Sequence, residues 1–190
     1  MERPRFEGQP DEVRLNSTAY SPSSAARIRR LIRRSGIDQR TFHFVDLGTG
    51  KGRPLIVASS YPFLSIVGVE ADPSLCDIAR NNVRTWTSKH AGPSIRIVES
   101  DARVAHFPEG NLFVFMHNPF VGDVLDAVAE RLAELTDSAR EVVVAYSGDE
   151  NCAALERTGA FSRVRLTPLR PWLPSTMSLF FSSASKQKRA

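Results

Sequence analysis

A glycine-rich run with one carboxylate, residues 46–52 (DLGTGKG), is the clearest place in the sequence for chemistry. Glycines let a backbone turn tightly and approach a ligand closely. Their spacing here is GxGxG, whereas loops that bind a dinucleotide pyrophosphate have GxGxxG. A carboxylate would repel a pyrophosphate, but it suits the cationic methionine end of S-adenosylmethionine. The run therefore favours a sulfonium cofactor over a nicotinamide dinucleotide. We expect contacts from Asp46, Gly48, Thr49, Gly50 and Gly52.

Further acidic residues follow at the ends of later β-rich runs. Glu70 comes 24 residues after Asp46, where a carboxylate can accept both ribose hydroxyls of a nucleoside. Asp101 and Ala102 follow the next run, where they would contact the adenine amine or shape its pocket. Taken singly, Glu70 could be an exposed strand end and Asp101 a helix cap. In order, at the ends of three successive strands, they predict one site for S-adenosylmethionine.

The residues placed to direct a reaction are Asn118, Pro119 and Phe120, directly after a fourth β-rich run. Methyl transfer from a sulfonium mainly requires a lone pair held about 3 Å from the methyl carbon and in line with the bond that breaks. The Asn118 side-chain carbonyl and a proline-fixed backbone carbonyl would accept two N–H bonds from a neutral amine. Phe120 would pack against the substrate group. The alternative is that Asn-Pro only begins a turn.

The elements that must position these residues alternate between short apolar runs and helical patterns. Strands are expected at 41–47, 65–70, 94–98, 112–116, 141–146, 161–166 and 177–181, and helices at about 21–36, 53–60, 72–91, 121–135 and 150–158. Such alternation predicts a parallel sheet with helices on both faces. The last two strands have no helical pattern between them, so they should form an antiparallel pair.

Three segments resemble motifs of the class I S-adenosylmethionine-dependent methyltransferases. VDLGTGKGR resembles the first motif, GVEADP the second and ESDA the third, and the resemblance runs from about residue 41 to residue 181. It implies an α/β fold: a Rossmann-like three-layer sandwich with a seven-stranded, mostly parallel sheet whose last strand is antiparallel.

The stretch 112–125 (LFVFMHNPFVGDVL) resembles the histone-lysine and the ATP-synthase-subunit lysine methyltransferases built on this fold. It also resembles the Asn-Pro-Pro-aromatic motif of enzymes that methylate adenine or glutamine, although it has one proline. These resemblances imply N-methylation, with a protein lysine as the first acceptor. A nucleic-acid or small-molecule methyltransferase and a non-catalytic cofactor-binding module are the alternatives.

Size and composition are consistent with one domain. The 190 residues are divided into a flexible lead-in at 1–20, a methyltransferase domain at 21–183 and a basic tail at 184–190. No apolar run approaches the ~20 residues of a membrane span. The N-terminus does not have the pattern of a signal peptide, and the two cysteines form no CxxC pair, so we expect a cytoplasmic protein. The four isolated histidines predict no metal site.

Positive charge is concentrated in one predicted helix. The chain has 25 basic and 21 acidic residues, and five arginines lie within residues 27–34. They form either a solvated face whose stems cover apolar surface or a site for an acidic protein or a phosphate backbone. No aromatic residue interleaves with them, which argues against base stacking. A nucleic-acid partner is therefore possible but not supported. Tyr20 precedes this helix, at a place where enzymes of the resembled class often close over the cofactor. The oligomeric state stays open.

Overall fold

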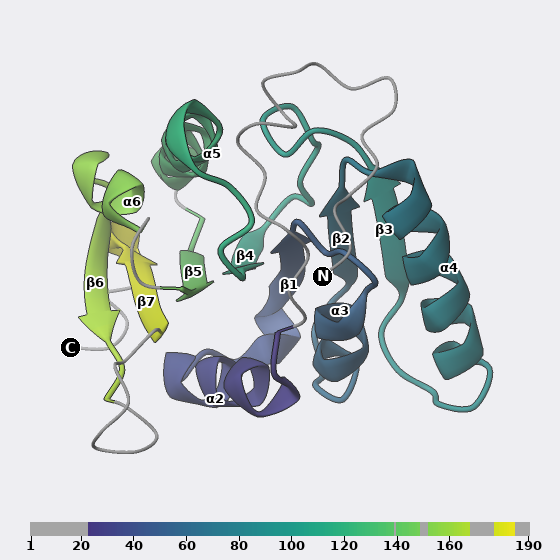
Figure 1. Cartoon of the computed structure of the whole chain (residues 1–190). Helices are drawn as coiled ribbons and strands as arrows, with labels where there is room; N and C mark the ends of the chain where they lie inside the picture. The colour runs from purple at the N-terminus through teal and green to yellow at the C-terminus, as the bar shows by residue number, and fades with distance from the viewer. Residues whose placement is uncertain (1–22, 139, 149–151, 168–176, 185–190) are drawn as a thin grey trace.

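Seven strands form a single sheet in the computed structural model, which describes residues 23–138, 140–148, 152–167 and 177–184 (Figure 1). In chain order the strands are β1 (Phe42–Leu47), β2 (Ile66–Glu70), β3 (Ile95–Glu99), β4 (Asn111–Met116), β5 (Val142–Ser147), β6 (Phe161–Arg165) and β7 (Met177–Ser182). Their order across the sheet is β3-β2-β1-β4-β5-β7-β6. The first five strands are parallel, and β7 lies antiparallel between β5 and β6. The predicted sheet is confirmed.

Helices cover both faces of this sheet. They are α2 (Ala25–Ser35), α3 (Arg53–Ala58), α4 (Pro73–Thr87), α5 (Gly122–Glu134) and α6 (Ala153–Arg157), with 3-10 turns η1 (Gln39–Thr41) and η2 (Leu135–Ser138). Apolar side chains of α2, α3 and α4 pack with Phe44, Phe113 and Phe115 on one face. Those of α5 and α6 pack with Val45 and Val114 on the other. Side chains alternate between the faces of a strand, so both layers are buried and the three-layer sandwich is confirmed.

Helix α2 follows its predicted pattern. Its buried side chains are Ile28, Leu31, Ile32 and Ser35, and it ends at Gly36 in the left-handed conformation (φ 62°). Glycine reaches that conformation without a Cβ clash, which is why it commonly terminates helices. The Ser21-Pro22 start expected for this helix lies outside the described residues.

Two helices differ in detail from the buried stripes that helical spacing predicts, which are Leu75, Ala79, Val83 and Trp86 in the first and Val124, Leu125, Val128, Leu132 and Leu135 in the second. In α4, Cys76 is fully buried, whereas Leu75 and Trp86 are half-buried. The helix is turned so that the Cys76 thiol reaches the Glu70 carbonyl oxygen at 3.5 Å, while the Trp86 indole reaches Ser59 Oγ at 2.9 Å near the rim. In α5, Ala129 is buried and Leu135 lies in η2, half-buried. Helix rotation is set by packing, which the spacing alone does not give.

The described residues leave out the lead-in 1–20, residues 168–176 between β6 and β7, and residues 185–190 of the predicted basic tail. Within the described part of the chain, no helix is long and apolar enough to cross a membrane. Cys76 and Cys152 are buried free thiols.

Candidate active site

The glycine-rich loop forms a tight turn between β1 and α3. Gly48, Gly50 and Gly52 all have positive φ, at 76°, 55° and 82°. The Gly48 and Thr49 N–H groups both donate to the Val69 carbonyl oxygen, at 2.9 and 3.0 Å, which ties the loop to β2. The left-handed conformations explain why glycine occupies these positions.

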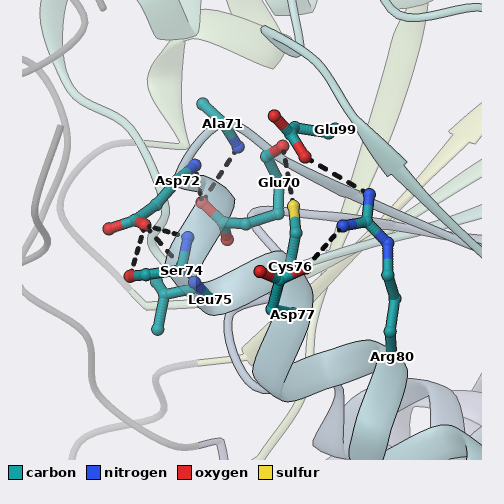
Figure 2. A network of polar contacts seen from close by, with 9 residues as sticks. All are labelled: Glu70, Ala71, Asp72, Ser74, Leu75, Cys76, Asp77, Arg80 and Glu99. Atoms are coloured by element: carbon teal, nitrogen blue, oxygen red, sulfur yellow. Dashed lines mark hydrogen bonds and ion pairs between the residues drawn. The ribbon is translucent and has the colours of Figure 1, made fainter. Parts of the chain in front are cut away.

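Glu70, at the end of β2, holds this loop in place through its carboxylate. Its Oε2 accepts from the Gly50 N–H at 2.8 Å, and its Oε1 accepts from the Ala71 and Asp72 N–H groups at 3.0 Å each. Figure 2 shows the carboxylate turned toward the chain that enters α4. Burial raises the Glu70 pKa, and the three N–H bonds act in the opposite direction. A carboxylate can accept about four hydrogen bonds, so three N–H donors leave capacity for a ligand hydroxyl.

Asp46 is the most deeply buried carboxylate of the predicted set. It is 1% exposed at the end of β1. Burial, together with the charge of Glu70, raises its pKa to about 7. The Thr49 hydroxyl lies close enough to lower this pKa, but its geometry falls short of a hydrogen bond. A carboxyl in this state ionises readily when a cation is placed beside it.

Unpartnered polar atoms gather at this edge of the sheet. Seven buried side-chain polar atoms of the described residues have no hydrogen-bond partner, and five lie at the carboxyl ends of the parallel strands. These are Asp46 Oδ2, Thr49 Oγ1, Asp72 Oδ2, His117 Nδ1 and Ser147 Oγ. Buried polar groups are nearly always hydrogen-bonded in folded proteins, so such a cluster indicates a place for a polar ligand.

Asn118 is held in an uncommon conformation by residues that the sequence analysis did not identify. Its φ is 47°, the one positive value among the described non-glycine residues. The Tyr146 hydroxyl donates to Asn118 Oδ1 at 3.2 Å. Gly148 lies so close that a Cβ there would be 2.8 Å from Asn118 Cβ. Tyr146 is fully buried, and burial raises its pKa well above the usual range, so it acts as a neutral hydrogen-bond donor.

Pro119 brings this segment against the glycine-rich loop. A Cβ added to Gly48 would lie 2.5 Å from Pro119 Cβ, closer than real Cβ atoms approach. Gly48 is therefore required both by its φ and by its neighbour. The structure thus brings the predicted cofactor loop and the predicted Asn118-Pro119 segment together. Phe120 is half-buried and packs against the core on the α5 side.

Asp101 and Ala102 lie after β3, each with an arginine partner. The Asp101 carboxylate accepts from the Arg103 backbone N–H at 2.8 Å and from its guanidinium at 3.0 and 2.7 Å. This pairing holds the Asp101 pKa below its usual range, although partial burial opposes it. Ala102 is buried, and its carbonyl oxygen accepts from Arg131 of α5 at 3.2 Å. The adenine contact expected of these residues stays a prediction.

The start of α2 lies beside the same edge. Arg53 Nη1 donates to the Ser23 carbonyl oxygen at 3.4 Å. Burial lowers the pKa of His117, and the charge of Arg27 on α2 lowers it further. Cationic groups of α2 and α3 therefore border the end of β4.

Comparison with known proteins places this geometry within one fold. No known family profile and no curated protein matches the sequence. Among solved structures, the methyltransferase domain of a bacterial CtHen1-CN has 13% identity and a TM-score of 0.57, over 83% of this chain and 96% of that chain. An RNA methyltransferase from Salinibacter ruber, in complex with S-adenosyl-L-homocysteine, has 20% identity and a TM-score of 0.52, over 85% and 92%.

An rRNA methylase from Streptococcus thermophilus has 9% identity and a TM-score of 0.56, over 80% of this chain and 92% of that chain. The chain has the class I methyltransferase fold. At these identities the similarity shows the fold, and the substrates of these proteins are their own.

Replacing Gly48 by alanine should separate the effect of contact with Pro119 from that of backbone strain. Gly48→Ala places a Cβ against Pro119 at a positive φ, so we expect the free energy of unfolding to fall by ~2–4 kcal/mol. Gly159→Ala is the matched control, because Gly159 has φ 69° and no atom within 4 Å of an added Cβ. It should lose only ~1 kcal/mol. Equal losses in urea denaturation would show that the Gly48–Pro119 contact has no energetic effect.

The ligand-free protein should be stabilised when Asp46 loses its charge. The folded pKa of about 7 lies above the ordinary value of 3.8, so the folded state binds a proton that the unfolded state has released. Wild-type stability attributable to Asp46 therefore falls as pH rises from about 4 to 7. Asp46→Asn should exceed wild type by ~1–3 kcal/mol at pH 8 and by little at pH 4.5. Asp77→Asn, on the exposed face of α4, is the control. An Asp46→Asn protein that is less stable at pH 8 contradicts this account.

Proposed function

We propose that this chain is an S-adenosylmethionine-dependent N-methyltransferase. The observation that carries the proposal is the packing of Pro119 against Gly48. This packing puts Asn118, which is in the left-handed conformation, next to a loop that has buried polar atoms without hydrogen-bond partners. A cofactor site and an acceptor site thus share one edge of the sheet, where ligands bind in open α/β folds.

The residues present fit this cofactor. Asp46 Oδ2 and Thr49 Oγ1 are buried polar atoms without partners, suited to an ammonium group. Glu70 retains acceptor capacity for a ribose hydroxyl, and Asp101 with Ala102 would border the adenine. Gly48, Gly50 and Gly52 would allow close backbone approach. When bound, S-adenosylmethionine supplies a methyl group on a sulfonium, which makes it an electrophile.

The acceptor side is suited to an amine. The Tyr146 hydroxyl fixes the Asn118 amide so that its oxygen is the end held in place. A carbonyl oxygen has two lone pairs, which lets Asn118 Oδ1 accept an N–H as well as the tyrosine hydroxyl. An amine held through its N–H groups directs its own lone pair forward, and such positioning is the main catalytic requirement of this reaction.

Protein lysine is the first acceptor class that we propose, on the resemblance of residues 112–125 to lysine methyltransferases. A nucleic acid is the second, and a specific observation favours it. Residues 23–69, which include α2, β1 and α3, contain eight basic and two acidic residues, whereas the rest of the chain has 17 and 19. A cationic surface beside the site attracts an anionic partner. The Salinibacter ruber and Streptococcus thermophilus structures, which share this fold, are RNA methylases by name.

Cofactor binding should depend on pH through Asp46. Isothermal titration with S-adenosylhomocysteine should give a Kd of roughly micromolar size at pH 8. Affinity should be about tenfold weaker at pH 6, because the Asp46 carboxyl, with its pKa of about 7, must release its proton to pair with the ammonium. Asp46→Asn should abolish the pH dependence and most of the binding, whereas Glu99→Gln, an exposed carboxylate at the end of β3, should change neither. Unaltered binding in Asp46→Asn would overturn the cofactor assignment.

The Asn118–Tyr146 pair should affect turnover rather than cofactor affinity. Asn118→Ala should lower kcat by about 100-fold or more, because the acceptor nitrogen loses its alignment. Tyr146→Phe should lower kcat by about tenfold with little change in the KM for the cofactor, because the amide can rotate. Tyr61→Phe, a half-buried tyrosine distant from β5 in the chain, is the control. Full turnover in Asn118→Ala would exclude its proposed role.

The acceptor class can be assigned with labelled cofactor. Wild-type protein and Asn118→Ala are each incubated with methyl-labelled S-adenosylmethionine and a host lysate, which is then separated into protein, nucleic acid and small molecules. Label that depends on Asn118 should appear in one fraction. Label in protein at lysine supports the first acceptor, and label in RNA or DNA supports the second. Label in small molecules alone excludes both acceptor classes.

A further inference from the structure

The arginine face of α2 is defined as Arg29, Arg33 and Arg34. All three side chains are exposed, and they make no ion pair or hydrogen bond within the described part of the chain. The helix itself, AARIRRLIRRS, contains no acidic residue. We infer that this face binds the phosphate backbone of a nucleic acid and leads it to the candidate active site. This inference rests on the proposed function and favours the second of its two acceptor classes, a nucleic acid, over protein lysine.

Some arginines elsewhere in the described chain are paired with acidic residues, whereas Arg96 and Arg165 are exposed and make no ion pair with another described residue. Arg40 pairs with Asp38, Arg80 with Asp77 and Glu99, Arg157 with Asp126, and Arg163 with Glu156. An ion pair of this kind neutralises the arginine charge, so the surface attracts an anionic partner less strongly. The side chains of the arginine face make no such ion pair within the described residues, and Asp38, the first acidic residue after them in the chain, is paired with Arg40.

The helix connects this charge to the site. It begins beside the carboxyl edge of the sheet, where Ser23 contacts Arg53 and where Arg27 influences His117. It ends at Gly36, and β1 starts at Phe42. Figure 1 shows α2 and α3 on the same face of the sheet. An extended chain lying along α2, which is about 16 Å long, would therefore arrive at Asn118.

The spacing and the side-chain type suit phosphates. Arg29 and Arg33 are one helical turn apart, about 6 Å along the axis, so they can contact successive groups of a regular polyanion. Guanidinium groups bind phosphate through two parallel N–H bonds. The helix has no aromatic residue on which a base could stack. Binding should therefore be independent of sequence, and the methylated nitrogen would be that of a base.

The inference is tested by binding of fluorescently labelled single-stranded RNA and DNA oligonucleotides of equal length, followed by anisotropy over a range of salt concentrations. The test variant is Arg29→Gln/Arg33→Gln/Arg34→Gln. The control is Arg80→Gln/Arg84→Gln/Arg96→Gln, which removes the same charge from exposed positions of α4 and β3. The test variant should bind at least tenfold more weakly near 0.1 M salt, and the slope of log affinity against log salt should fall by about 2, or about 0.7 per phosphate contact. The control should change affinity less than threefold.

Equal losses in the two variants would overturn the inference, because net charge alone would then explain binding. If wild-type protein binds neither the RNA nor the DNA oligonucleotide, the inference is also overturned. Stronger binding to poly-glutamate, with the same dependence on α2, would replace the nucleic acid by an acidic protein. S-adenosylhomocysteine titrations on the same samples separate the two proposals. Cofactor binding without oligonucleotide binding refutes only the proposal that α2 binds nucleic acid. Absence of both kinds of binding refutes the proposed function.

Discussion

The bonds from the Glu70 carboxylate to three backbone N–H groups are the constraint on which the site depends. They join the turn after β1, through Gly50, to the chain that enters α4. A buried carboxylate without such donors would be strongly unfavourable. The loop donates an N–H group to this carboxylate, and the carboxylate in turn ties the loop to the start of α4. Gly48, in the same loop, leaves the room that Pro119 occupies.

Local patterns predicted the elements because they concern residues near each other in the chain. The helix expected from about residue 72 does start there, with Asp72 Oδ1 accepting from the Ser74 and Leu75 N–H groups, and the helix expected to reach residue 36 ends at Gly36. The antiparallel pair of β6 and β7 was predicted because the sequence between them has no helical pattern. The rotation of α4, which buries Cys76 instead of Leu75, depends on how several elements pack, and spacing could not supply it.

The site residues could be proposed from sequence, but their partners could not. Asn118 and Tyr146 meet because β4 pairs with β5 in the register Met116–Tyr146, and register is not a property of either strand alone. The one sequence signal that could have indicated Tyr146 as a site residue is its place at the polar end of an apolar strand. The Asp101–Arg103 pair is local, yet an isolated i, i+2 pair of charges is common in loops and carries little information.

The charges of this molecule are divided between its interior and its surface. The carboxylates suited to a cationic cofactor, Asp46 and Glu70, are buried, where low dielectric strengthens their attraction for a cation. The arginine face of α2 (Arg29, Arg33 and Arg34) is exposed, where water screens its charges from those carboxylates. Arg27, on the same helix, influences the end of β4. One small domain can therefore attract both a cationic cofactor and an anionic substrate, because the buried carboxylates act on the cofactor and the exposed arginines act on the substrate.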